Sequence, residues 1–194
     1  MVSAVILAAG SSARMGAVNK LLLPFRSKTI IEIVTENIIA SGIEEVIVVL
    51  GYEGRLIQAA LQHLPVNFVN NSWYEKGMTT SIQQGIGIAN GNGYMICLGD
   101  MLKISPAEYA SLVIFFENTY SLDPACICIP ACNLQKGNPV IFASGYKEAI
   151  LQCAFMEGCR DIVQSNKKNL YLLEMSTDHV LSDLDYKEDY EKLL

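Results

Sequence analysis

Near its start the chain reads Ser3-Ala4-Val5-Ile6-Leu7-Ala8-Ala9-Gly10-Ser11-Ser12-Ala13-Arg14-Met15-Gly16, and Lys20 follows shortly after. The apolar first half, residues 3–9, predicts a buried β-strand. The second half is a small, serine-rich loop between two glycines, which leaves backbone N–H groups uncovered. Two cations, Arg14 and Lys20, lie in or just after this loop. Uncovered amides together with fixed positive charge predict a site that holds a polyphosphate.

The loop matches neither of the common nucleotide-binding motifs. A P-loop has four residues between its glycines and then Lys and Ser or Thr, whereas five residues separate Gly10 from Gly16 and Ala17 follows. The dinucleotide motif requires glycine where this chain has Ser12. The spacing alone leaves two interpretations open: a phosphate loop of another kind, or a glycine-rich turn with incidental charges.

Length and composition predict one globular domain over residues 1–194. Hydrophobic residues make up 51% of the chain and charged residues 18%, and the net charge of −6 argues against a nucleic-acid partner. We recognise no targeting segment, and no apolar stretch reaches the ~20 residues that span a bilayer. We therefore expect a soluble, cytoplasmic protein that binds neither nucleic acid nor membrane.

The six cysteines are interpreted as structural thiols. Cys97, Cys126 and Cys128 lie within apolar runs, where thiols behave as small hydrophobic groups. Cys128 and Cys132 have a spacing seen in metal sites, but no second pair and no nearby histidine completes a set of four ligands.

Apolar runs alternate with helical patterns along most of the chain. The predicted strands are residues 3–9, 45–50, 66–69, 93–99, 125–130, 139–143, 170–175 and 179–184. The predicted helices are residues 29–41, 54–63, 80–89, 105–119, 145–153 and 186–194. Continuous apolar strands separated by helices predict an α/β fold with a mostly parallel sheet covered on both faces. Ligands of such folds bind beyond the carboxyl ends of the strands.

Gly99-Asp100 directly follows the apolar run of residues 95–98. A carboxylate at the end of a buried strand, beside a phosphate loop, is suited to binding Mg²⁺. The alternative is an ordinary aspartate of a turn or a helix N-cap.

Two further segments follow predicted strands. Residues 71–81 lead into a helix, where Thr80 and Gln83 are typical of a capping box and the neighbouring hydroxyls can hold a ribose or a phosphate. In residues 181–190, Asp183 and Asp185 alternate on an extended segment, so only one of them can face the site. The alternative is a solvated N-cap of the last helix.

The chain resembles the MobA-like NTP transferases, and among them the molybdenum cofactor cytidylyltransferases (MocA-like proteins). Leu7 to Lys20 resembles their motif Leu-Ala-(Ala/Gly)-Gly-x-Ser-x-Arg-Met-Gly-x-x-Lys, with one extra residue before the lysine. Ala9 stands where guanylyl-transferring relatives usually have Gly. The remaining motifs of the resemblance are residues 71–85, 99–101, 136–142 and 183–190, in the order of the family.

This resemblance implies a single-domain, three-layer α/β/α Rossmann-like nucleotidyltransferase fold, of the nucleotide-diphospho-sugar transferase type. It implies transfer of a nucleoside monophosphate from an NTP, with CTP favoured over GTP, to a phosphorylated acceptor, and release of pyrophosphate. The implied acceptor is of the molybdopterin type, the implied cofactor is Mg²⁺, and a molybdenum enzyme is a possible partner.

The resemblance also implies the site residues. Arg14, Lys20 and Asp100 are the expected catalytic residues, and the expected metal ligands are Asp100 and Asp185, with Asp183 as the alternative to Asp185. The expected nucleotide-binding residues are Leu7, Ala8, Ala9, Gly10, Ser11, Ser12, Arg14, Lys20, Gly77, Thr79, Thr80, Ser81 and Gly99.

The chain departs from the family pattern in three places. Leu102 replaces the proline after Gly-Asp-Met, residues 157–162 replace a Gly-Asp-x-Gly element, and Tyr186-Lys187 replaces Thr-Pro. These departures lie on the acceptor and metal sides and keep two alternatives open. One is a nucleotidyltransferase for a sugar-phosphate or alcohol-phosphate acceptor. The other is a non-catalytic, nucleotide-binding accessory protein of molybdenum enzymes.

Overall fold

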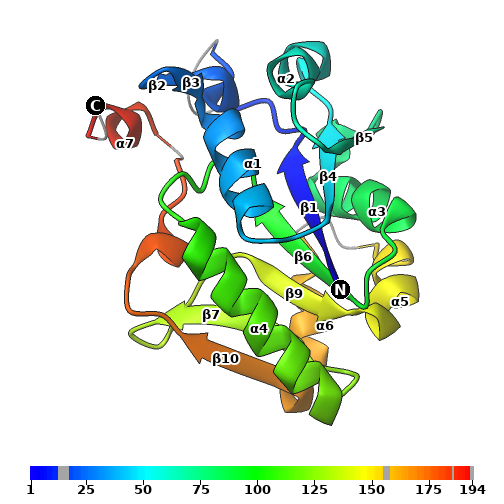
Figure 1. Cartoon of the computed structure of the whole chain (residues 1–194). Coiled ribbons are helices and arrows are strands. Elements are labelled where there is room, and N and C mark those ends of the chain that lie inside the picture. Colours follow the sequence, from blue (N-terminus) through cyan, green and yellow to red (C-terminus); the bar gives the residue numbers. More distant parts are fainter. Residues whose placement is uncertain (13–17, 155–157, 185, 193–194) are drawn as a thin grey trace.

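The computed structural model describes residues 1–12, 18–154, 158–184 and 186–192 (Figure 1). Within these ranges the main sheet has eight strands in the order β10-β7-β9-β6-β1-β4-β5, with β8 paired to β7. The strands are β1 Val2–Ala8, β4 Glu45–Leu50, β5 Asn67–Asn70, β6 Gly93–Leu98, β7 Ile127–Cys132, β8 Gln135–Lys136, β9 Val140–Ala143 and β10 Leu170–Glu174. A separate ribbon pairs β2 Pro24–Phe25 with β3 Lys28–Thr29.

Helices connect most of the strands. The α-helices are α1 Ile30–Ala40, α2 Gly54–Leu61, α3 Met78–Ile88, α4 Pro106–Leu122, α5 Lys147–Leu151, α6 Arg160–Ser165 and α7 Lys187–Glu191. The 3-10 helices are η2 Lys20–Leu22, η3 Tyr74–Lys76, η4 Ser144–Tyr146, η5 Lys167–Asn169 and η6 His179–Leu181. In the part of the chain that is described, no helix combines the length and apolarity needed to cross a membrane.

The sheet is mostly parallel, as the sequence predicts. β1 pairs in parallel with β4 and β6, β4 with β5, and β7 with β10. Within the described part of the main sheet, only β9 and the short β8 run antiparallel to their neighbours. The parallel half, from β6 to β5, aligns the carboxyl ends of β1, β4 and β6 at one edge (Figure 1).

The two faces of the sheet carry separate apolar cores, because side chains alternate along each strand. In β1, Ala4 and Ile6 belong to one core and Val5 belongs to the other. α1, α2 and α4 supply the helical side of the first core, and α3, α5 and α6 supply that of the second. This arrangement is the expected three-layer α/β/α sandwich.

Reciprocal capping boxes mark the starts of α1 and α4. Ser105 caps α4, with Pro106 in the first turn, and its hydroxyl oxygen accepts from the Glu108 backbone N–H at 3.3 Å. Thr29 and Glu32 form the same reciprocal box at the start of α1. Both helices therefore begin where the sequence predicts.

Two local predictions are wrong. Residues 179–184 do not form a strand: η6 occupies His179–Leu181, and the Val180 carbonyl accepts a single hydrogen bond from Asn138 N–H at 2.9 Å. The capping box at Thr80 and Gln83 is also absent, since α3 begins at Met78. The Gln83 amide instead donates to carbonyl oxygens at the end of α5, among them that of Ile150 at 3.0 Å.

Candidate active site

A cavity of about 610 Å³ opens at the edge where β1, β4 and β6 end. It is built by the loops that follow these three strands, by the turn between β5 and α3, and by one residue of the C-terminal part of the chain. Its lining residues are Leu7, Ala9, Gly10, Ser11, Ser12, Lys20, Leu21, Tyr52, Tyr74, Glu75, Gly77, Met78, Ser81, Leu98, Gly99, Asp100 and Asp183. The rule that ligands of such folds bind beyond the carboxyl ends of the strands therefore locates the cavity correctly.

One wall depends on close packing around Gly51. A Cβ atom there would lie 2.7 Å from the Cβ of Ala9 and 2.9 Å from that of Tyr74, closer than real side chains approach. The Tyr52 N–H donates to the Ala9 carbonyl at 3.1 Å. Glycine at position 51 thus allows the β1 loop, Tyr52 and Tyr74 to meet. Tyr52 is not among the site residues expected from the sequence, although it follows the predicted strand of residues 45–50 as closely as the expected site residues follow their strands.

The turn before α3 is organised by the buried amide of Asn71. Its Nδ2 donates to Thr80 Oγ1 and Ser81 Oγ, each at 2.9 Å, and its Oδ1 accepts from Trp73 N–H at 2.9 Å. The Thr80 hydroxyl in turn donates to the Gly77 carbonyl at 2.9 Å. Thr80 therefore stabilises the turn and does not line the cavity, in contrast to its expected nucleotide contact.

Lys20 connects three segments of the site. Its Nζ lies 2.5 Å from Asp100 Oδ2 and donates to the Leu184 carbonyl at 2.8 Å. Its backbone N–H donates to Ser12 Oγ at 3.2 Å. Lys20 thus links the β1 loop, the end of β6 and the C-terminal part of the chain.

The charges at this junction favour an additional cation. Asp100 is only 6% exposed, and burial raises the pKa of its carboxyl group. The ion pair with Lys20 opposes this rise, whereas the negative charge of Asp183 adds to it, and the net pKa is raised. A divalent cation at this place would stabilise the charged form of Asp100, which burial and the neighbouring carboxylate disfavour.

The two carboxylates of this site are suited to binding Mg²⁺ only together with a bound ligand that supplies further oxygen atoms. Within the described ranges, no group of three or more His, Cys, Asp or Glu side chains could hold a metal ion. Mg²⁺ is commonly bound by one or two carboxylates plus substrate phosphates. Asp100 and Asp183 provide such a partial set at the rim of a cavity that can contain a triphosphate.

Ten of the expected residues line the cavity. They are Leu7, Ala9, Gly10, Ser11, Ser12, Lys20, Gly77, Ser81, Gly99 and Asp100. Ala8 is instead fully buried in the core, and Thr79 is buried with its hydroxyl accepting from Gly158 N–H at 3.0 Å. Arg14 and Asp185 lie outside the described residues. Asp183, which the sequence left as an alternative to Asp185, does line the cavity.

A second cavity, of about 670 Å³, adjoins the first and shares Met78, Leu98 and Asp183 with it. It lies over β7 and β9, beside α6. Apolar side chains, including Ile129 and Phe142, form much of its wall. Its other lining residues are Ile82, Ile96, Lys136, Gly137, Asn138, Val140, Gly158, Arg160, Val163 and Gln164, of which Lys136 and Arg160 are cationic. Residues 136–142 are one of the motifs of the family resemblance. The departure at residues 157–162, expected on the acceptor and metal sides, includes Gly158 and Arg160 of this cavity.

Comparison with known sequences identifies a family. The model of the MobA-like NTP transferase domain matches residues 4–170. The nicotine blue oxidoreductase of Paenarthrobacter nicotinovorans is 26% identical over 196 residues, covering 100% of this chain and 96% of that protein. A probable molybdenum cofactor guanylyltransferase of Methanosarcina mazei is 31% identical over 128 residues, covering 63% of this chain and 55% of that protein.

Solved structures share the fold along the whole chain. A nucleotidyl transferase from Methanothermobacter thermautotrophicus superimposes with a TM-score of 0.86 at 24% identity, covering 100% of this chain and 95% of that one. A Mycobacterium tuberculosis protein solved in complex with manganese gives a TM-score of 0.77 at 21% identity, covering 100% of this chain and 97% of that one. The α/β nucleotidyltransferase fold expected from the sequence is confirmed.

Proposed function

Because the chain belongs to the MobA-like NTP transferase domain family, we propose that it transfers CMP from CTP to a phosphorylated acceptor of the molybdopterin type, releasing pyrophosphate. The observation that carries this proposal is the cluster of Lys20, Asp100 and Asp183 in the first cavity, of which Asp183 also lines the adjoining second cavity. A transfer reaction needs two substrates side by side, with their negative charge neutralised where they meet.

The first cavity accommodates the nucleotide. The backbone and hydroxyl groups of Gly10 to Ser12 hold the phosphates, and Tyr52 and Tyr74 enclose the nucleoside. Lys20 Nζ neutralises charge on the α-phosphate as the bond to pyrophosphate breaks. Asp100 and Asp183 would hold Mg²⁺, which would supply Lewis-acid chemistry to the triphosphate.

The second cavity accommodates the acceptor. Its apolar wall, with Ile129 and Phe142, suits a flat ring system, and Lys136 and Arg160 suit an attached anion. A phosphate oxygen of the acceptor attacks the α-phosphorus of the nucleotide. This oxygen is already anionic at neutral pH, so no strong general base is required. Consistently, neither histidine of the chain lines the two cavities.

The full-length similarity to a nicotine blue oxidoreductase supports a second candidate, the reduction of a small organic substrate by a nicotinamide nucleotide. Nucleotidyl transfer has a direct use for a lysine beside two carboxylates that can hold a divalent cation, because it must neutralise the charge of a triphosphate, whereas hydride transfer has no such requirement. The Lys20–Asp100–Asp183 cluster therefore favours nucleotidyl transfer. Oxidation of NADPH by an added quinonoid dye, dependent on the protein, would favour the reductase instead.

The decisive test is pyrophosphate release from each of the four ribonucleoside triphosphates with Mg²⁺, with and without molybdopterin cofactor. We expect release from CTP that depends on the acceptor. Release only with sugar-phosphate or alcohol-phosphate acceptors would replace the proposed acceptor class. Nucleotide binding with no release under any condition would support the non-catalytic accessory protein.

A further inference from the structure

The segment of residues 175–184, called here the C-terminal strap, ends at the candidate active site. It leaves β10 with Met175 N–H donating to the Ala131 carbonyl at 2.7 Å. At its other end, Asp183 lines both cavities and the Leu184 carbonyl accepts from Lys20 Nζ. The position of the strap therefore sets the position of two groups of the site.

The strap has no regular strand pairing that would hold it in place. Its η6 turn is internally bonded, and Val180 is fully buried. Gly137 lies against this turn so closely that a Cβ atom there would overlap the Val180 carbonyl. These contacts hold the middle of the strap, and the side chains of Thr177 and His179 add further contacts to it.

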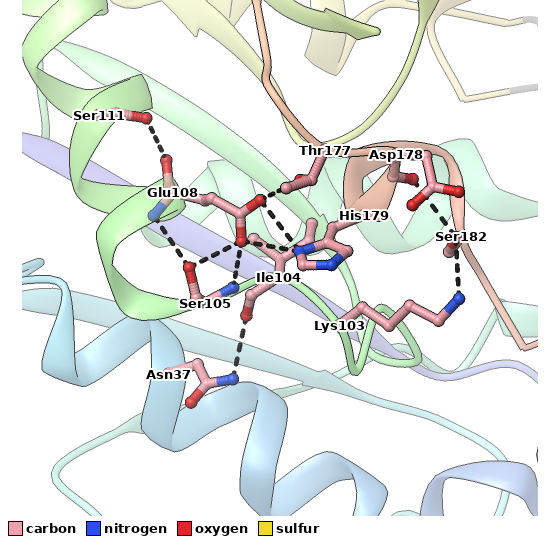
Figure 2. A network of polar contacts seen from close by, with 10 residues as sticks. All are labelled: Asn37, Lys103, Ile104, Ser105, Glu108, Ser111, Thr177, Asp178, His179 and Ser182. Atoms are coloured by element: carbon pink, nitrogen blue, oxygen red, sulfur yellow. Dashed lines mark hydrogen bonds and ion pairs between the residues drawn. The ribbon is translucent and has the colours of Figure 1, made fainter. Parts of the chain in front are cut away.

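Those contacts converge on Glu108, in the first turn of α4 (Figure 2). Thr177 Oγ1 donates to its carboxylate at 2.5 Å, and His179 Nδ1 lies 3.1 Å from each carboxylate oxygen. Ser105 adds its hydroxyl at 2.7 Å and its backbone N–H at 2.8 Å. Figure 2 shows the strap joined to the start of α4 through this carboxylate, and to Lys103, in the loop before α4, through Ser182.

The start of α4 is itself connected to the site. Ser105 follows Asp100 by a short loop, and in that loop the Ile104 carbonyl accepts from Asn37 Nδ2 at 3.0 Å. Glu108 thus fixes, through Ser105, the loop that carries Asp100, and, through Thr177 and His179, the strap that carries Asp183. This carboxylate therefore links the segments that carry the two aspartates, in addition to the direct link that Lys20 Nζ makes between Asp100 and the Leu184 carbonyl.

We infer that Glu108 is a positioning residue, which holds the C-terminal strap so that Asp183 and Asp100 meet at the site where the two substrates react. The inference rests on the proposed function for its catalytic consequence, and on geometry alone for the placement of the two carboxylates. Glu108 itself lines neither cavity and touches no substrate.

The test compares Glu108→Gln and Thr177→Val with Thr177→Ser, which restores the hydroxyl donor. Glu117→Gln is the matched control, because Glu117 lies on the same helix, is exposed, and pairs with the N-terminal amine at 3.5 Å. Mn²⁺ binding is measured by electron paramagnetic resonance in the presence of α,β-methylene CTP. Removing a group that orients a metal ligand weakens metal binding roughly 10- to 100-fold.

We expect about tenfold weaker Mn²⁺ binding in Glu108→Gln and Thr177→Val, and near wild-type binding in Thr177→Ser and Glu117→Gln. CTP binding without metal, measured by calorimetry in EDTA, should change less than about twofold, because the strap contributes only Asp183 to the nucleotide cavity. Amide hydrogen exchange at Leu181 and Ser182 should be faster in the two defective variants.

Unchanged Mn²⁺ binding in both defective variants would overturn the inference. An equal loss of metal-free CTP binding would overturn it as well, because Glu108 would then support the fold in general. If wild-type protein transfers no nucleotide while the Mn²⁺ and exchange effects appear, the proposed function fails and the positioning role stands.

Discussion

Lys20 and Asp100 form an ion pair with 2.5 Å between Nζ and Oδ2, although one follows β1 and the other follows β6. Both residues line the first cavity, and Lys20 is also bonded to the Leu184 carbonyl. The parallel sheet creates this proximity by ending the two adjacent strands at the same edge. A cation and a buried carboxylate held together there are the expected basis of triphosphate chemistry.

Lys20→Met and Asp100→Asn should each lower turnover about 100- to 1000-fold, which is the usual effect of removing one group that stabilises charge in the transition state. Steady-state pyrophosphate release measures the loss, and circular dichroism checks that both variants remain folded. Lys28→Met is the matched control, since Lys28 forms an exposed ion pair with Glu36 away from the cavity. Near-full turnover in either site variant would contradict the assignment.

Gly51→Ala should raise the KM for the nucleotide and lower stability by roughly 1–3 kcal/mol, because the added methyl group collides with Ala9 and Tyr74. Urea unfolding and initial rates at varied CTP measure the two effects. Gly87→Ala is the control: a methyl group there meets nothing within 4 Å. A Gly51→Ala variant as stable and active as the control would show that this wall is not tightly packed.

Lys136→Gln should raise the KM for the acceptor about tenfold while leaving the KM for CTP within twofold, since Lys136 lines only the second of the two cavities. Lys168→Gln, a change of the same kind at an exposed position outside both cavities, should alter neither constant. Rates measured over a grid of the two substrate concentrations separate the effects. Equal changes in both KM values would argue against separate nucleotide and acceptor cavities.

The stability contribution of Glu108 should depend on pH. Burial raises the pKa of this carboxyl group, but hydrogen bonds from Thr177, Ser105 and His179 outweigh burial and lower the pKa to about 2. A lowered pKa stabilises the fold fully above about pH 5, and this contribution is lost as the pH falls toward 2. Urea unfolding should show wild type more stable than Glu108→Gln by roughly 2–3 kcal/mol at pH 7.

This difference between wild type and Glu108→Gln should shrink markedly at pH 2.5. Glu117→Gln should differ little from wild type at either pH, because the exposed ion pair of Glu117 contributes little to stability. A difference for Glu108→Gln that is equal at pH 7 and pH 2.5 would show that the hydrogen bonds do not depend on the charge of the carboxylate.

Much of the fold could be predicted from local patterns. The buried strands β1, β4 and β6 are continuous apolar runs, and the start of α4 is marked by Ser105 and Pro106. The errors arise where contacts with residues distant in the sequence determine the local structure. Gln83 fits a capping box locally, but the carbonyl groups at the end of α5 bind its amide.

The same reason limits prediction of the site. Strand ends identified Asp100 and the β1 loop, because that rule depends only on topology. Thr79 and Thr80 have suitable hydroxyl groups, but neighbouring backbone atoms bind them. The roles of Gly51, Tyr52 and Glu108 depend on contacts between separate segments, which residue spacing does not reveal.

We propose that Lys20, Asp100 and Asp183 act together where nucleotide and acceptor react. A transfer assay follows ³²P from CTP labelled at the α-phosphate, incubated with Mg²⁺, molybdopterin cofactor and either wild-type protein or Asp100→Asn. We expect label to enter the acceptor with wild-type protein and transfer to fall about 100-fold or more with Asp100→Asn. Acceptor that stays unlabelled with wild-type protein, or label transfer that persists in Asp100→Asn, would refute this assignment.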